Sequence, residues 1–270
     1  MRWARATGWL ADDAGSFSTS AGRVRFSEDV LNSVGPNKVH ASVEAALADL
    51  LRDGMRLMSG GFGLSGIAEA CIDEIARRAP RDLTVISNNC GNQGQGLAVL
   101  LQKKLVRAVI CSYVGGNPDL AEQYLAGTVA VELNPQGTFA ERIRAGGAGL
   151  GGFFTPVGAG TIVAEGKESR MIDGKLQILE APLRADLAIL RAQVADRFGN
   201  ARFHRTGRNF SPLMATAATV TVLETDTLVD VGAIDPDDVH LPGVYVDRIV
   251  HVPQHRDIIE FRTTRPRSAP

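Results

Sequence analysis

A run of glycine and serine is the first feature of this sequence that could take part in chemistry. Residues 57–66 read LMSGGFGLSG, and five of the seven residues from Gly60 to Gly66 are glycine or serine. Such a loop lets backbone N–H groups approach a ligand closely, and a following helix adds the positive end of its dipole. The loop therefore predicts contact with an anion or with an atom that gains negative charge. A tight turn whose glycines serve only packing is the alternative.

The same loop matches the G-x-G-x-x-G pattern of dinucleotide-binding proteins, from Gly61 to Gly66. That pattern needs an acidic residue about 20 residues further on, at the end of the second strand, to bind the ribose hydroxyls. The expected second strand, LTVIS, instead runs into Asn88 and Asn89, where no carboxylate is available. We therefore interpret the match as accidental.

The elements that must position this loop alternate between strands and helices. Apolar runs predict strands at 55–58, 83–87, 106–113 and 129–133. Helical patterns are found at 43–51, 67–79, 97–104, 117–127 and 139–147. In the fourth of these, Asn117 is expected to be the N-cap and Pro118 the first helical residue. This alternation predicts an α/β fold built of βαβ units around a mostly parallel sheet, with loops at the carboxyl ends of the strands available for a site.

The pattern changes after Gly146. A glycine-dense stretch covers residues 146–160, a hairpin is expected around Asp173-Gly174, and central strands are expected at 185–196 and 218–226. No break in composition divides the body of the chain. We expect one domain over residues 37–262, preceded by a disordered extension (1–36) of undetermined role and followed by a flexible tail (263–270).

Composition excludes several classes of function. The 270 residues are 44% hydrophobic and 22% charged, with a net charge of −1 and no basic patch, so nucleic acid is not an expected partner. The sequence contains no uninterrupted run of eighteen apolar residues, so no membrane span is expected. Cys71, Cys90 and Cys111 are interpreted as reduced core thiols of a cytoplasmic protein. The five histidines have no metal-ligand spacing, so we expect no metal.

Four segments together resemble a known family. DGMRLMSGGFGLSGIAE, TVISNN, ELNPQGTFAERIRAGGAGLGGFFTPVGAGT and GRNFSPLMATAA are similar to the A (α) chain of the two-chain, family I CoA-transferases. The resemblance runs from about Val39 to Val252 with the motifs in the same order. It implies an open, mostly parallel α/β sheet with helices on both faces, and an enzyme that moves CoA between short carboxylic acids.

The resemblance also implies a mechanism and a partner. In this family a glutamate attacks the acyl-CoA thioester in a ping-pong reaction, and that glutamate lies in the B subunit within a Ser-Glu-Asn-Gly motif. This sequence has no such motif. Glu132 and Glu141 are expected to be structural, Glu141 as the partner of a nearby arginine. The chain is therefore expected to be active only with the CoA-transferase B subunit, in an A2B2 heterotetramer.

Site residues follow from the same resemblance. It assigns Gly60, Gly61, Phe62, Gly63, Leu64, Ser65 and Gly66 to the loop that approaches CoA, although Ser59 and Ala68 depart from the family pattern. Gln136 matches a glutamine that faces the reactive glutamate; its amide can stabilise charge on a carbonyl oxygen. Asn88 and Asn89 could orient a carboxylate substrate. A turn-closing role for Gln136 and an Asx-turn for the asparagines are the alternatives. Arg208-Asn209-Phe210 is expected to support the fold or to form an intersubunit contact.

The sequence identifies the type of reaction more closely than it identifies the donor and acceptor acids. We expect succinyl-CoA or acetyl-CoA as donor and acetoacetate as acceptor, with the CoA thioester a substrate and no cofactor permanently bound. The alternatives are the corresponding A chain of a 3-oxoadipate or acetate/butyrate CoA-transferase. A phosphosugar isomerase-like enzyme and a ligand sensor on the same fold are less favoured, because neither explains NPQGTFAERIRAGGAG.

Overall fold

The computed structural model describes residues 10–11, 17–18, 37–92 and 94–254. The chain divides into two units, Met1–Gly35 and Pro36–Pro270. In the first unit β1 (Leu10–Ala11) pairs antiparallel with β2 (Phe17–Ser18). Most of residues 1–36 and all of 263–270 lie outside the described residues, so the extension and the tail remain predictions. The following paragraphs concern the second unit.

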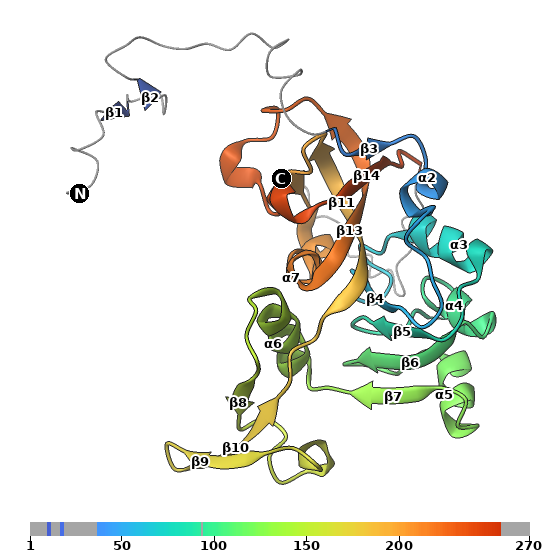
Figure 1. The fold of residues 1–270 in the computed structure, drawn as a ribbon, viewed down its shortest axis with the longest axis vertical. Coiled ribbons are helices and arrows are strands. Elements are labelled where there is room, and N and C mark those ends of the chain that lie inside the picture. Colours follow the sequence, from blue (N-terminus) through green and yellow to red (C-terminus); the bar gives the residue numbers. More distant parts are fainter. Residues whose placement is uncertain (1–9, 12–16, 19–36, 93, 255–270) are drawn as a thin grey trace, which may run out of the picture. The chain divides into compact units, whose positions relative to one another are not determined.

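A parallel sheet forms the centre of this unit (Figure 1). From edge to edge its strands are β3 (Val39–His40), β14 (Arg248–His251), β13 (Ala218–Val229), β11 (Ala185–Asp196), β4 (Arg56–Ser59), β5 (Leu83–Ile86), β6 (Val106–Cys111) and β7 (Ala130–Leu133). Each neighbouring pair in this order is parallel, and only the short β12 (Ala201–Arg202) pairs antiparallel, with β11. The open, mostly parallel sheet is therefore confirmed.

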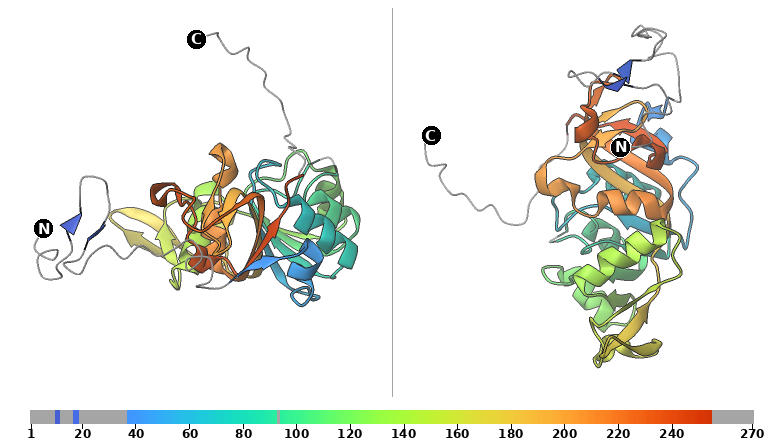
Figure 2. Two further views of the ribbon diagram at one scale, coloured as in Figure 1. Left: turned by 90° about the horizontal axis from the view of Figure 1, so that it is seen from above. Right: turned by 90° about the vertical axis from the view of Figure 1, so that its left-hand side faces the viewer.

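Helices cover both faces of the sheet, as expected (Figures 1 and 2). One face carries α2 (Val43–Leu47), α3 (Glu69–Arg78), α4 (Ala98–Gln102) and α5 (Pro118–Leu125). The other carries α6 (Gln136–Gly147) and α7 (Ser211–Ala217). Neighbouring residues of one strand serve the two cores in turn: Leu57 packs in the first and Met58 in the second. This is the side-chain alternation of a strand buried on both faces.

Local signals set several element boundaries. Asn117 caps α5 by accepting the Leu120 N–H at 3.0 Å, and Pro118 is the first helical residue, as predicted. Other boundaries differ from the prediction. The helix expected over 43–51 ends at Leu47, and α6 begins at Gln136 rather than at residue 139.

A separate three-stranded sheet begins within the second glycine-dense stretch. Its strands, in the order β8 (Phe153–Thr155), β10 (Lys175–Glu180) and β9 (Ser169–Ile172), are antiparallel. The predicted hairpin at Asp173-Gly174 is confirmed: both residues have positive φ, 50° and 72°, as a type I′ turn requires. In Figure 1 this sheet lies beyond α6, away from the main sheet.

The chain order creates a switch point in the main sheet. From β4 the chain adds β5, β6 and β7 toward one edge, and it then returns to place β11, β13 and β14 on the other side of β4. In open α/β sheets, ligands bind outside the carboxyl ends of the strands at such a point. The Gly60–Gly66 loop leaves the carboxyl end of β4 there.

Among the described residues, no helix combines the length and the apolarity needed to cross a membrane.

Candidate functional site

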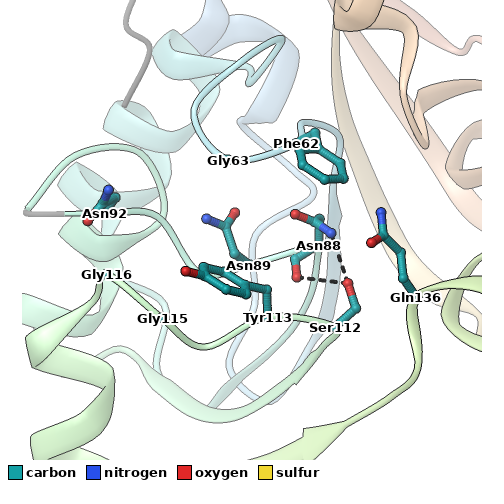
Figure 3. Close-up of a pocket in the computed structure, with 10 residues that line it drawn as sticks. All are labelled: Phe62, Gly63, Asn88, Asn89, Asn92, Ser112, Tyr113, Gly115, Gly116 and Gln136. Carbon is teal, nitrogen blue, oxygen red and sulfur yellow. Dashed lines mark hydrogen bonds between the residues drawn. The ribbon is translucent and has the colours of Figure 1, made fainter. Parts of the chain in front are cut away.

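A pocket of about 430 Å³ opens at the carboxyl ends of the strands from β4 to β7 (Figure 3). Each of the loops after β4, β5 and β6, and the first residue of α6, contributes to its wall. The lining residues are Phe62, Gly63, Asn88, Asn89, Asn92, Ser112, Tyr113, Gly115, Gly116 and Gln136. Residues far apart in the sequence thus meet because parallel strands end at one edge.

The pocket brings together five of the ten residues singled out from the sequence. Phe62, Gly63, Asn88, Asn89 and Gln136 all line it. The other five belong to the same loop but face elsewhere. Gly60 lies against Ser211, Leu64 is buried in the core, and Ser65 and Gly66 line a smaller cavity of about 220 Å³.

Several backbone N–H groups of the loop after β4 are already bonded to acceptors within the protein. Phe62 and Ser65 exchange N–H to carbonyl hydrogen bonds of 3.0 and 3.1 Å, which closes a four-residue turn. Gly60 N–H donates to Ile189 O at 3.1 Å, and Gly61 N–H donates to Asn209 Oδ1 at 2.9 Å. Within the described chain the N–H of Gly63, which lines the pocket, has no such acceptor. The backbone cradle is therefore narrower than the sequence suggested.

Asn88 and Asn89 have different surroundings although they are adjacent. The side-chain amide of Asn88 donates to Ser112 Oγ at 2.8 Å, and the backbone carbonyl of Asn88 accepts the N–H groups of Ser112 and Tyr113. Asn88 thus joins the loops after β5 and β6 rather than forming an Asx-turn. The Asn89 amide has no hydrogen-bond partner among the described residues and lies at the pocket. Asn89 is the better placed of the two to meet a ligand.

Gln136 is the first residue of α6, so it does not merely close a turn. The Phe139 N–H bonds to Pro135 O at 2.8 Å and starts the helix without help from the Gln136 side chain. That side chain is exposed, lacks a hydrogen-bond partner in the described part of the chain, and extends along the pocket beside Ser112 (Figure 3). Its amide is free to donate to a bound oxygen.

Carboxylates of the neighbouring elements are engaged outside the pocket. Arg142, a buried residue of α6, hydrogen-bonds Glu132 and Asn134 and donates to Ala181 O at 2.7 Å. Partial burial disfavours ionisation of Glu132, but the hydrogen bond and charge of Arg142 hold its pKa below the ordinary value. Glu141 pairs with Arg144 at 2.6 Å. These contacts agree with the structural roles expected for both glutamates, and the nearby arginine that pairs with Glu141 is Arg144.

The described residues that line the pocket include no aspartate, glutamate, histidine, cysteine, lysine or arginine. Two thiols lie behind it. Cys90 and Cys111 are free and buried, and burial raises the pKa of the Cys111 thiol to about 11. The pocket can therefore bind and orient a ligand and stabilise charge on it through amides, a hydroxyl and backbone N–H groups. It does not itself supply a carboxylate nucleophile.

Five lining residues were missed by sequence reasoning, namely Asn92, Ser112, Tyr113, Gly115 and Gly116. Four of them lie in the segment SYVGGN, in the loop directly after β6, just as Asn88 and Asn89 lie in the loop directly after β5. The expectation that sites lie after parallel strands could have found them, had it been applied to the third strand as well.

Comparisons with known proteins agree with this geometry. A family model described as coenzyme A transferase matches residues 40–252. The chain is 51% identical to the A subunit of a succinyl-CoA:3-ketoacid coenzyme A transferase from Xanthomonas campestris pv. campestris (strain B100), over 84% of this chain and 94% of that protein. It is 46% identical to the protein of the same name from Helicobacter pylori (strain J99 / ATCC 700824), over 85% and 98% of the two chains.

Solved structures share the fold at lower sequence identity. Glutaconate coenzyme A-transferase from Acidaminococcus fermentans superposes with a TM-score of 0.71 at 22% identity, covering 80% of this chain and 76% of that one. An acyl-CoA transferase from E. coli O157:H7, in a thioester complex with CoA, gives a TM-score of 0.73 at 22% identity and 82% coverage of this chain. This chain spans 48% of that protein, about half its length.

Proposed function

This chain belongs to the coenzyme A transferase family, and from that premise we propose that it is the A subunit of a succinyl-CoA:3-ketoacid CoA transferase. The names of relatives with 46–51% identity support this reaction. The single observation that carries the proposal is the composition of the pocket: amides and backbone groups surround a cavity whose described lining has no carboxylate. Such a site suits an acyl group but needs its nucleophile from another chain.

In the proposed reaction the nucleophile is a glutamate of the B subunit. Its carboxylate attacks the carbonyl carbon of succinyl-CoA, and the C–S bond breaks to give an acyl-glutamyl anhydride and CoA thiolate. The thiolate then attacks the glutamyl carbonyl, which releases succinate and leaves a glutamyl-CoA thioester. A 3-oxoacid such as acetoacetate takes CoA by the reverse sequence, so no external oxidant or permanently bound cofactor is needed.

This chain contributes groups that meet the charge formed in those steps. Each attack places negative charge on a carbonyl oxygen, and a preorganised neutral N–H donor lowers the barrier. Two such donors line the pocket and have no hydrogen-bond partner in the described part of the chain: the side-chain amide of Gln136 and the Gly63 N–H in the loop after β4. We assign the orientation of the donor or acceptor carboxylate to the Asn89 amide, which lies at the pocket and has no hydrogen-bond partner among the described residues.

Exposed apolar side chains beside the pocket support a protein partner. A groove of about 350 Å³ runs along α5 and the edge strand β7, lined by Val114, Leu120, Ala121, Tyr124, Leu125, Val131 and Leu133. Val114 follows Tyr113 of the pocket directly, and Leu125 is 84% exposed. Apolar patches and sheet edges of this kind are surfaces that partners cover. We propose that the partner is the transferase's B subunit, in an A2B2 assembly within the cytoplasm.

A transfer assay with and without the matching B subunit tests the proposal. The purified pair receives succinyl-CoA or acetyl-CoA as donor and acetoacetate, 3-oxoadipate, acetate or butyrate as acceptor. We expect transfer from succinyl-CoA to acetoacetate by the pair and none by either chain alone, with a mass that fits A2B2. Activity of this chain alone, or a well-folded pair without transfer between any of these acids, contradicts the proposal.

A further inference from the structure

Asn209 contacts the loop after β4 at both of its ends. Its Oδ1 accepts the Gly61 N–H at 2.9 Å, and its Nδ2 lies 3.4 Å from Ser65 O. Ser65 O also accepts the Phe62 N–H that closes the four-residue turn. One side chain, 148 residues away in the sequence from Gly61, thus spans the turn that places Phe62 and Gly63 at the pocket.

The segment that carries Asn209 is itself held firmly. Asn209 Nδ2 donates to Gly207 O at 2.9 Å and to Thr206 O at 3.3 Å, while its Oδ1 also accepts the Phe210 N–H at 2.7 Å. Phe210 is buried and packs edge-on against Phe139 at 5.4 Å between ring centres. Asn209 has a positive φ of 28°, a conformation that non-glycine residues adopt only when their surroundings impose it.

The loop and this segment also fit closely at Gly66. A Cβ atom at Gly66 would lie 2.7 Å from Gly207 O and 3.0 Å from Asn209 Nδ2. Only a residue without a side chain allows this close approach. The φ of 76° at Gly66 also favours glycine, independently of the contact. The loop therefore takes its shape from the segment 205–209 as well as from its own sequence.

We infer that Asn209 is a positioning residue for the acyl-transfer site, holding the loop after β4 so that Gly63 N–H and Phe62 face the bound acyl group. Asn209 does not line the pocket, so it acts through the loop and not on the substrate. The inference rests on the proposed function, since it assigns the loop a role in the same site.

The test compares Asn209→Gly with Asn200→Ala in the complex with the B subunit. Glycine removes the side-chain contacts of Asn209 and tolerates its positive φ, so backbone strain does not confuse the result. Asn200 is the matched control. Its side-chain Nδ2 donates to Asp196 at 2.8 Å, and its side-chain Oδ1 accepts the Gly243 N–H at 3.0 Å. These bonds hold a loop that does not line the pocket.

We expect Asn209→Gly to lower kcat by about 10²-fold with a much smaller change in KM, because a small misplacement of catalytic donors has effects of this size. Asn200→Ala should lower the thermal unfolding midpoint about as much as Asn209→Gly does, but it should leave kcat unchanged. Equal kcat values for Asn209→Gly and wild type overturn the inference, as does a loss of kcat in both variants that follows their stability.

A second measurement keeps the inference testable without activity. Hydrogen–deuterium exchange of peptides covering residues 60–66 should be faster in Asn209→Gly than in wild type, and unchanged in Asn200→Ala. Equal exchange overturns the positioning role. If Asn209→Gly does not fold, Asn209→Asp retains the acceptor for Gly61 and loses the donor to Ser65, and is measured in the same way. An inactive wild-type pair contradicts the proposed function alone, because exchange still reports on the loop.

Discussion

The two glycine-dense stretches, residues 60–66 and 146–160, are alike in sequence and differ in their surroundings. In the first, Gly60, Gly61 and Gly66 each lie so close to a neighbouring residue that a Cβ atom would approach it within 2.7 Å. The second contains both kinds of glycine. A Cβ atom at Gly146, Gly147 or Gly152 would also lie within 2.7 Å of a neighbour, whereas Gly149, Gly151 and Gly160 have open space around them. The first stretch forms part of the pocket, whereas the second leads into the small β8-β10-β9 sheet. Glycine density alone therefore does not distinguish a ligand loop from a set of turns.

The largest effect is expected from the amide that faces the first stretch across the pocket. Gln136→Ala should lower kcat of the complex by about 10²–10³-fold, the loss typical for one donor to a developing oxyanion. Thermal stability should hardly change, because Gln136 is exposed and α6 does not depend on its side chain. Gln177→Ala, in β10 beyond the second stretch, is the control and should retain activity. Full activity of Gln136→Ala excludes a catalytic role for this amide.

The next effect separates the glycines themselves. Gly66→Ala should lower the free energy of unfolding by about 2–3 kcal/mol, because it combines a left-handed backbone with overlap on the Gly207 carbonyl. Gly151→Ala, which meets nothing within 4 Å, should change it by no more than about 0.5 kcal/mol. Urea unfolding of the two variants measures both values. Similar losses in the two variants contradict the distinction between a closely packed glycine and an open one.

The stability of the protein is expected to depend on pH through Glu224, which contacts the helix that follows the first stretch. Glu224 is buried, accepts the Cys71 N–H at 2.6 Å through Oε1, and has no described hydrogen-bond partner at Oε2. Burial raises its pKa from 4.5 to about 7, a rise that the charge of Arg191 opposes and that of Glu69 favours. Since the folded-state pKa is the higher one, the associated stability is fully present below about pH 4.5 and is lost as the pH rises through about 7.

Glu224→Gln should remove this dependence. Between pH 5 and 8 the free energy of unfolding of the wild type should fall relative to the variant by on the order of 2 kcal/mol, at about 1.4 kcal/mol per pKa unit. Glutamine retains the oxygen that accepts from Cys71. Unfolding curves of both proteins across this range provide the measurement, and parallel curves would show that Glu224 does not titrate there.

The smallest effect concerns the surfaces next to the two stretches. Leu125→Glu, in the groove beside the pocket, should weaken association with the B subunit by about tenfold, or about 1.4 kcal/mol. The control is Ile162→Glu. Ile162 lies between β8 and β9 and is 80% exposed, close to the 84% of Leu125. This substitution should leave the affinity unchanged. Titration of each variant with the same partner compares the dissociation constants, and the reverse ranking would place the partner on the small sheet.

Much of the fold could be predicted because its signals are local. The strand at 185–196 was predicted with its observed bounds, since it contains the apolar run 187–190, which is buried on both faces of the sheet. The cap and first residue of α5 followed from Asn117-Pro118, and the hairpin from Asp173-Gly174. The start of α6 at Gln136 was missed, because residues 136–138 carry no apolar periodicity and the preceding proline and following glycine suggested a turn.

The sequence by itself determined the parallel α/β architecture, the position of the glycine-rich loop between a strand and a helix, and the absence of the Ser-Glu-Asn-Gly motif of the B subunit. These are matters of residue type and spacing along one segment. Only the tertiary structure decided which residues share the pocket and that Asn209 contacts a loop 148 residues away. It also showed that Asn88 joins two loops, while the Asn89 side chain has no hydrogen-bond partner among the described residues. The physical reason is that these contacts depend on strand order and on loop closure across the sheet, and neither leaves a periodic signal in the segments that meet.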